Sequence, residues 1–163
     1  NDQGLIAEHW DNLAAVAEPN PSGRTQTDGA TEASELEKTE ENRSLIKAFL
    51  EDVMQGRHPE KTPEYFAGDA YLQHNTGIAD GLSGLGAALE ALAADGIQMI
   101  YDRTHQVLAQ GNFVLGVSEG TFGGKPTSYY DLWRVEDGKV AEHWDVMETI
   151  ADPADRQNEN GKF

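Results

Sequence analysis

The chain has 163 residues, with 29 acidic side chains against 12 Lys and Arg and a net charge of −17. Nucleic acids and anionic membranes attract clustered cations, so a chain this acidic with scattered Lys and Arg argues against both as partners. The absence of cysteine excludes disulfides and thiolate nucleophiles. No apolar run approaches the roughly 20 residues of a membrane span. No signal peptide is recognisable, so we expect a cytoplasmic protein.

The chain begins with a segment that recurs near its end. Residues 4–13 match residues 138–147 at six of ten positions, and the offset of 134 residues is the length of a domain rather than of a solenoid repeat. We therefore expect residues 1–17 to be the terminal strand of a preceding domain of the same kind. Because such a strand exposes apolar side chains and unpaired backbone, it should add to a sheet edge or pack on a neighbouring chain.

The next residues predict a linker and then one long helix. Residues 18–38 are rich in Pro, Gly, Ser, Thr and acids, which indicates an extended linker, and residues 39–163 have the length of one compact domain. The helix is predicted to begin at Thr39, an N-cap followed by two glutamates, and to end at Gly56. Its apolar stripe consists of Leu45, Ile46, Phe49, Leu50, Val53 and Met54.

Two shorter helices and a short strand follow. Residues 63–67 predict the second helix, and residues 70–75 predict the strand. A third helix, capped by Ser83, is indicated by apolar residues at helical spacing and ends at Asp95-Gly96. Those apolar residues are Leu82, Leu85, Leu89 and Leu92.

After Gly96 the pattern changes to four strands joined by turn sequences, at residues 97–109, 113–122, 127–135 and 140–147. Helices followed by an antiparallel meander predict an α+β fold. We expect a cone-shaped, curved antiparallel sheet with three N-terminal helices packed on its concave face, and a pocket between sheet and helices.

The last hairpin predicts a candidate catalytic group. A three-residue turn with Gly138 in the left-handed conformation sets its register. Asp131 then lies opposite His143. Asp145 lies on the same face, opposite Tyr129, because side chains alternate along a strand.

Two carboxylates and an imidazole on one face suit acid/base chemistry. A carboxylate in an apolar cavity has a raised pKa, and a second carboxylate raises one of the two further, so the group can take and return a proton beside a carbonyl. Asp145, Asp131 and His143 are therefore the candidate catalytic residues. The alternative is that Asp131 and His143 form a satisfied interior hydrogen-bonded pair.

Five further residues are candidates for substrate binding. His74 and Asn75 end the short strand and are expected to face the same layer, and His105 lies in mid-strand. Tyr129 and Trp133 could line an apolar pocket, although aromatic residues in a meander are at least as often plain core. The histidines lack the spacing of metal ligands, so no metal site is expected.

Five motifs follow one another within about residues 39–163: Tyr71-x-Gln-His-Asn, Gly-x-Phe-Val-Leu at 111–115, Tyr130-Asp-Leu-Trp-Arg-Val-Glu-Asp-Gly-Lys, Glu-His-Trp-Asp-Val at 142–146 and the closing Asn158-x-Asn-Gly-Lys-Phe. Together they resemble the SnoaL-like group of the nuclear transport factor 2-like superfamily. The resemblance implies an α+β cone with a deep pocket that pairs into homodimers through the sheet.

The resemblance also implies a chemistry. Members include polyketide cyclases that close rings by aldol condensation, steroid isomerases and dehydratases, all without a cofactor. The acid/base of the cyclases is an aspartate that matches Asp145, and a second polar group matches Asp131, where the cyclases carry a His. We therefore expect a cofactor-free acid/base enzyme on a small apolar carbonyl compound. The alternative is a non-catalytic module of the same fold that binds a small ligand or only dimerises.

Overall fold

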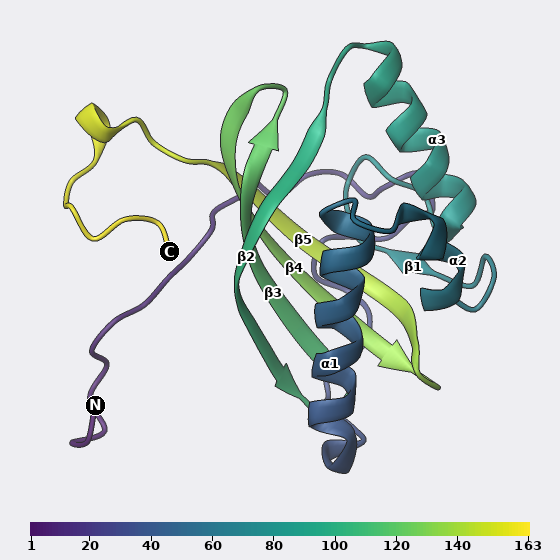
Figure 1. Ribbon diagram of the computed structural model, residues 1–163, viewed down its shortest axis with the longest axis horizontal. Helices are drawn as coiled ribbons and strands as arrows, with labels where there is room; N and C mark the ends of the chain where they lie inside the picture. The colour runs from purple at the N-terminus through teal and green to yellow at the C-terminus, as the bar shows by residue number, and fades with distance from the viewer.

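The computed structural model describes residues 1–163, with helices first and most of the sheet afterwards (Figure 1). Residues 1–35 form no helix or strand. Single helical turns lie at Leu36–Lys38, Pro59–Lys61 and Pro153–Asp155. The principal elements are α1 (Thr39–Phe49), α2 (Thr62–Tyr65), β1 (Leu72–Gln73), α3 (Gly81–Ala94), β2 (Met99–Gln110), β3 (Phe113–Phe122), β4 (Lys125–Glu136) and β5 (Lys139–Thr149).

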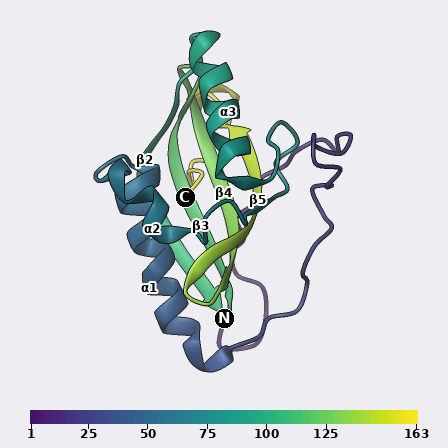
Figure 2. The same cartoon turned by 90° about the vertical axis from the view of Figure 1, so that its right-hand side faces the viewer.

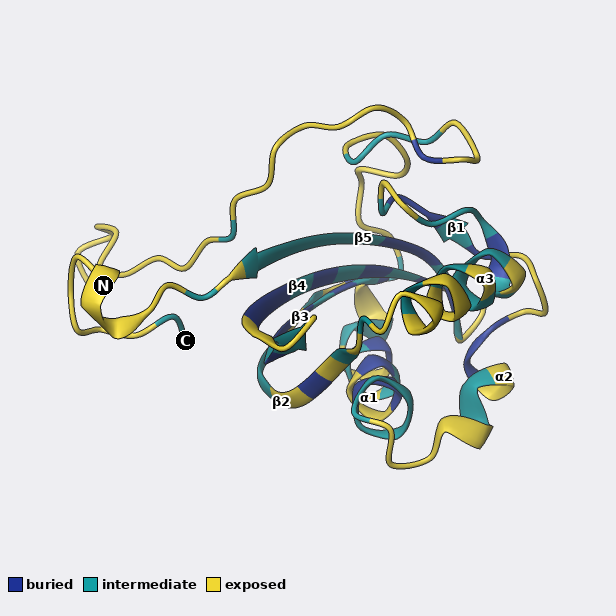
Figure 3. Ribbon diagram, turned by 90° about the horizontal axis from the view of Figure 1, so that it is seen from above, coloured by how far each residue is buried: buried dark blue, intermediate teal, exposed yellow.

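The five strands form one curved sheet in the order β1-β5-β4-β3-β2. The meander from β2 to β5 is antiparallel, as predicted, whereas β1 pairs in parallel with β5 and makes the sheet mixed. All three helices lie on the concave side (Figure 3), with α1 and α3 following one another along that face (Figure 2). The predicted α+β cone is therefore confirmed, with one parallel edge strand added.

The core lies between α1 and the sheet. Ile46 and Leu50 are fully buried, and Phe49 makes an edge-to-face contact with Trp133 at a centroid separation of 5.8 Å. The helical path continues through a wide turn at Leu50–Met54 and stops at Gly56, whose φ of 69° is left-handed, as predicted. The core consists of Ile46, Phe49, Leu50, Tyr65, Phe66, Tyr71, Val114, Trp133, Val135 and Val140.

The third helix begins earlier than predicted and is less covered than the first. It starts at Gly81, with φ 86°, rather than after a Ser83 cap. Ser83 instead donates from its backbone N–H and its hydroxyl to the Asp69 carboxylate, both at 2.8 Å. Leu82 packs on the core, but Leu89 is 45% exposed. No helix of the chain is both long and apolar enough to cross a bilayer.

The N-terminal residues cross the outer face of the sheet, opposite the helices (Figure 3). The strand expected within residues 1–17 does not form, and Ile6 is 92% exposed. Asn12 anchors the segment, since its amide donates to the carbonyls of Ser128 (3.0 Å) and Val146 (2.8 Å) and its oxygen accepts from the Ser128 hydroxyl. The segment's origin in a preceding like domain stays a prediction.

Residues 18–35 form no helix or strand and are bound to the domain rather than free, and residues 36–38 form a single helical turn. Asn20 is only 4% exposed and donates to the carbonyls of Gln73 (2.6 Å) and Ile78 (2.9 Å). Arg24 Nε contacts both carboxylate oxygens of Asp80 at 2.9 Å. The composition of residues 18–38 predicted a linker but could not predict these hydrogen bonds and this ion pair with the domain.

The last hairpin has a shorter turn than predicted. Its loop has two residues, Asp137 and Gly138, which both have positive φ (50° and 70°) and so match the twist of the strands. A bulge at Ala141 then shifts the register by one more residue, so Val140 turns into the core instead of the outer face.

Beyond the bulge, the combined shift of two residues changes the cross-strand partners but not the faces. Asp131 lies opposite Asp145, and Trp133 lies opposite His143, so the predicted Asp131–His143 and Tyr129–Asp145 pairings were wrong. Because the side-chain period along a strand is two, all five residues keep a common face.

Candidate functional site

Asp131, His143 and Tyr101 form a buried polar cluster on the concave face of the sheet. Asp131 on β4 has no exposed surface, and its Oδ1 lies 3.0 Å from His143 Nε2 on β5. Tyr101 on β2 points its hydroxyl at the same carboxylate and donates to both oxygens at 3.2 Å. Three strands therefore fix this carboxylate from two sides.

The short strand β1 adds two more polar groups. Its parallel pairing with β5 puts Gln73 opposite His143, and Gln73 Oε1 lies 3.1 Å from His143 Nδ1. Asn75 follows the strand and donates from its amide to Asp145 Oδ2 at 2.7 Å. Asp145 thus has a fixed partner and keeps part of its surface exposed.

The surroundings of Asp145 favour its protonated form. Burial raises the pKa of this carboxyl above its usual value of about 3.8, and the negative charge of Asp131 raises it further, while His143 and Asn75 oppose the shift. A carboxylate whose pKa is moved toward neutrality is a stronger base and a usable acid near neutral pH.

The pKa of His143 is also raised, although burial acts on it in the opposite direction. Burial alone would lower its pKa, but the hydrogen bond to Asp131 and the negative charges of Asp131 and Asp145 outweigh burial and raise the pKa above 6.5. Burial also raises the pKa of the Tyr101 hydroxyl well above 10, with help from the same two carboxylates. Tyr101 is therefore a neutral hydrogen-bond donor throughout the physiological range.

Tyr129 and Trp133, both predicted to bind substrate, border the cluster as packed side chains. Tyr129 stacks on Tyr101 with centroids 4.1 Å apart, and its hydroxyl donates to the Thr121 carbonyl at 2.8 Å. Trp133 stacks on His143 at 5.3 Å and belongs to the core. Both residues hold the rings of the cluster in place.

The structure brings neither His74 nor His105 to the cluster. His74 alternates with Gln73 and Asn75, so it faces the outer side of the sheet rather than the expected layer. There its Nε2 lies 2.9 Å from Glu142 Oε1 and its ring stacks on Trp144 at 4.5 Å.

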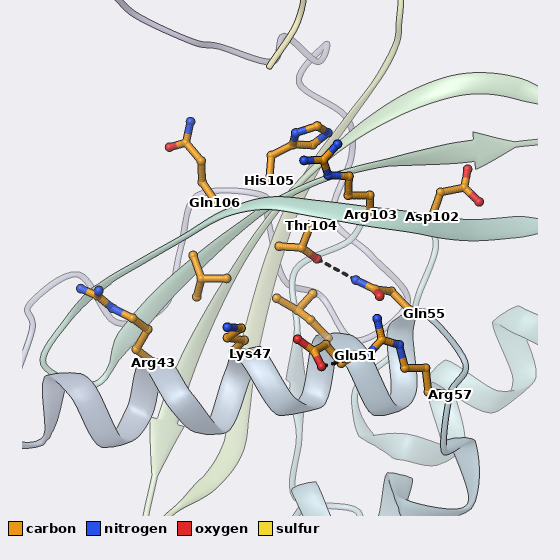
Figure 4. Close-up of a pocket in the computed structure, with 12 residues that line it drawn as sticks. Arg43, Lys47, Glu51, Gln55, Arg57, Asp102, Arg103, Thr104, His105 and Gln106 are labelled. Atoms are coloured by element: carbon orange, nitrogen blue, oxygen red, sulfur yellow. Dashed lines mark hydrogen bonds and ion pairs between the residues drawn. The ribbon is translucent and has the colours of Figure 1, made fainter.

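His105 lies on β2, where its ring stacks on that of Phe163 at 4.2 Å and its Nε2 is 3.3 Å from Glu119. The strand prediction placed it correctly in mid-strand, but Figure 4 shows its ring on the side of β2 away from α1. His105 therefore does not face the cluster, although Tyr101 on the same strand does.

Sequence analysis missed Gln73 as a site residue. A usable signal was present, because Gln73 lies two residues before Asn75 and two after Tyr71, and a strand puts all three on one face. What the sequence lacked was the pairing of this strand with β5, which gives Gln73 its partner.

A separate hollow of about 460 Å³ lies between α1 and β2 (Figure 4). Four of the 12 Lys and Arg residues border it, and the cluster carboxylates do not. Figure 4 shows that Arg103 and His105 point to the side of β2 away from α1, whereas Thr104 points toward Gln55. The cations therefore do not converge on one point. No three His, Asp or Glu side chains are grouped as metal ligands.

Comparisons with known proteins agree with this architecture. A structure of a proposed ketosteroid isomerase from Kribbella flavida DSM 17836 superposes with a TM-score of 0.57 at 17% identity, over 76% of this chain and 91% of that one. A protein of unknown function with a cystatin-like fold from Xanthomonas campestris gives 0.54 at 20% identity, over 65% and 89%. An NTF2-like protein from Burkholderia xenovorans LB400 gives 0.51 at 23% identity, over 68% and 92%.

At these sequence identities, the structural similarities show the fold alone. No functionally curated protein matches the sequence. The family model described as "SnoaL-like domain" matches residues 46–143, which is more than half of the chain and runs from α1 to the cluster histidine. The chain therefore belongs to the SnoaL-like family.

Proposed function

We propose that this protein is a cofactor-free acid/base enzyme that moves a proton beside the carbonyl of a small apolar compound, as an isomerase, cyclase or dehydratase. The observation that carries the proposal is Asp145, a partly exposed residue whose carboxyl has a pKa raised by burial and lies beside the buried Asp131–His143 pair. The protein's membership in the SnoaL-like family supports the same class of chemistry.

The proposed roles follow from exposure and charge. Asp131 and His143 are buried, whereas Asp145 is partly exposed, so Asp145 takes the proton from the carbon beside the carbonyl and returns it to the product. The negative charge that develops on the carbonyl oxygen is stabilised by the positive field of the His143 imidazolium. Asn75 holds the Asp145 carboxylate in one orientation through its 2.7 Å hydrogen bond.

A second function is favoured by a specific observation. The carboxylate of Asp131 and both ring nitrogens of His143 already have hydrogen-bond partners inside the domain. Such a satisfied network is also what a purely structural interior pair requires. The alternative is a non-catalytic module of the same fold that binds a small apolar ligand.

Solvent-deuterium exchange separates the two functions. The protein is incubated in D2O with β-keto esters, cyclic enones and diketones, and label uptake is followed by mass. If the protein is an acid/base enzyme, the rate of label uptake should fall at least a hundredfold in Asp145→Asn, because general acid/base catalysis contributes roughly 10²–10⁴-fold to the rate. The exposed Asp155→Asn variant is the matched control and should retain the wild-type rate.

Two other outcomes would contradict the proposed role of Asp145 or support the binding module. Uptake that persists in Asp145→Asn would remove Asp145 from the proposed role. Compounds that bind to the wild type and to Asp145→Asn equally well, without any label uptake, would support the binding module.

We also propose that the protein forms a homodimer through the sheet. The outer face is partly covered by residues 18–38, which Trp144 holds by donating to the Asp28 carbonyl at 2.9 Å. Sedimentation equilibrium of the whole chain tests the proposal, and a monomer at all concentrations would contradict it.

A further inference from the structure

Gln73 is a buried amide that touches the cluster without belonging to its acid/base groups. Its side chain is 1% exposed, and it contacts His143 across the parallel pairing of β1 with β5. A Gln amide has an acceptor end and a donor end, so its orientation determines which kind of group can face it.

The neighbours of Gln73 fix that orientation. The backbone N–H of Asn75 donates to Oε1 at 2.9 Å, and a backbone N–H can only donate. The other end, Nε2, donates to the Tyr71 hydroxyl at 3.2 Å. A flipped amide would put its NH2 group against the Asn75 N–H, so the end that faces His143 Nδ1 is the oxygen.

The oxygen in turn requires a hydrogen on Nδ1 of His143. A ring nitrogen 3.1 Å from an acceptor oxygen must carry a hydrogen, because two lone pairs at that distance repel one another. The ring is also held flat between Trp133 and Tyr71, with interplanar angles of 19° and 20°, which keeps Nδ1 aimed at Gln73.

We infer that Gln73 is a positioning residue that accepts the Nδ1 hydrogen of His143, so that both ring nitrogens face acceptor oxygens, Gln73 Oε1 and Asp131 Oδ1, and the ring is held as an imidazolium. Nδ1 then stays protonated as long as the Asp131–His143 pair keeps its shared proton. The protonation of His143 does not depend on the proposed function, whereas the predicted effect of Gln73 on turnover rests on it.

The inference has a consequence for Asp145. An imidazolium at His143 helps to keep the neighbouring Asp145 ionised and ready to accept a proton. Without the acceptor at Gln73, the ring is less often positive, so Asp145 should ionise only at higher pH. The acidic limb of a turnover–pH profile should therefore move to higher pH in a variant that lacks the amide.

Nitrogen NMR of the histidine rings tests the protonation of both nitrogens directly, with or without a substrate. The chain with ¹⁵N-labelled histidine gives five ring systems, and His143→Asn identifies the one of interest. In the wild type at pH 7, where an ordinary imidazole is mostly neutral, both ring nitrogens of His143 should give the shifts of protonated nitrogens. Gln73→Leu should lower the ratio of imidazolium to neutral ring two- to tenfold at a given pH, the equivalent of one neutral hydrogen bond.

Two further variants serve as a retained acceptor and as a control away from the cluster. Gln73→Glu retains an acceptor for both hydrogens, so it should keep Nδ1 protonated and move the ring titration to higher pH. Gln55→Leu removes an amide bonded to Thr104, away from the cluster, and should leave the His143 shifts unchanged.

The outcomes are separable from those of the exchange experiment. A bare Nδ1 in the wild type, or a folded Gln73→Leu with unchanged His143 shifts, would overturn the inference whatever the activity. If Gln73→Leu does not fold, the wild type and Gln73→Glu still decide the question. Absence of deuterium uptake with the expected nitrogen shifts would contradict the proposed function and leave the positioning role in place.

Discussion

Replacing Asp131 with Asn changes the charge of the buried cluster while nearly preserving its shape. Asp131 accepts hydrogen bonds from the Tyr101 hydroxyl and from His143 Nε2 in a site with no exposed surface. In the variant, the Asn oxygen can still accept from Tyr101. Its NH2 group can donate to a neutral His143, so the lost interaction is the one between an imidazolium and a carboxylate.

The magnitude follows from the two kinds of hydrogen bond. A bond between charged groups contributes about 1.5–3 kcal/mol and a neutral one about 0.5–1.5 kcal/mol. We therefore expect Asp131→Asn to lower the free energy of unfolding by about 1–2 kcal/mol where His143 is protonated. The pKa of His143 is raised in the folded state, so this stabilisation is complete below about 6.5, the unfolded value, and is lost as pH rises through the folded pKa.

Urea unfolding between pH 5 and 9 measures the difference, with Asp155→Asn as an exposed control. The difference between wild type and Asp131→Asn should be largest near pH 5–6 and shrink toward pH 9. A difference that is constant with pH, or that grows as pH rises, would refute the charged pair as its source.

Three further predictions concern the core, the acid/base group and the N-terminal segment. Ile46→Ala removes a fully buried side chain and should lower the free energy of unfolding by about 2–5 kcal/mol, measured with urea. Asp145→Asn should raise the melting temperature at pH 7, by a stabilisation on the order of 1 kcal/mol, because the raised pKa means that the folded state penalises the ionised form. The gain should vanish at pH 3, where Asp145 is protonated in both states. Deleting residues 1–17 removes the three hydrogen bonds of Asn12 and should lower the melting temperature or change the oligomeric state, and no change in either would contradict a docked segment.

Local periodicity in the sequence was enough to predict the first helix and the meander. The apolar stripe around Ile46 has helical spacing, and Gly56 ends the helix because it alone adopts the left-handed backbone without cost. The common face of Asp131, His143 and Asp145 also followed from alternation. It survived an error of two residues in the register because the period of a strand is two.

The partners of those residues depended on contacts that no local pattern contains. The parallel pairing of β1 with β5 joins residues about 70 positions apart, and it alone puts Gln73 on His143, Asn75 on Asp145 and His74 on the outer face. The docking of Asn20 likewise depends on the carbonyls of Gln73 and Ile78, which are 53 and 58 residues away in the chain. The sequence by itself determined which side chains share a face, because that depends on backbone geometry within one strand. Only the tertiary structure decided which strands are neighbours, because that depends on how distant segments pack together.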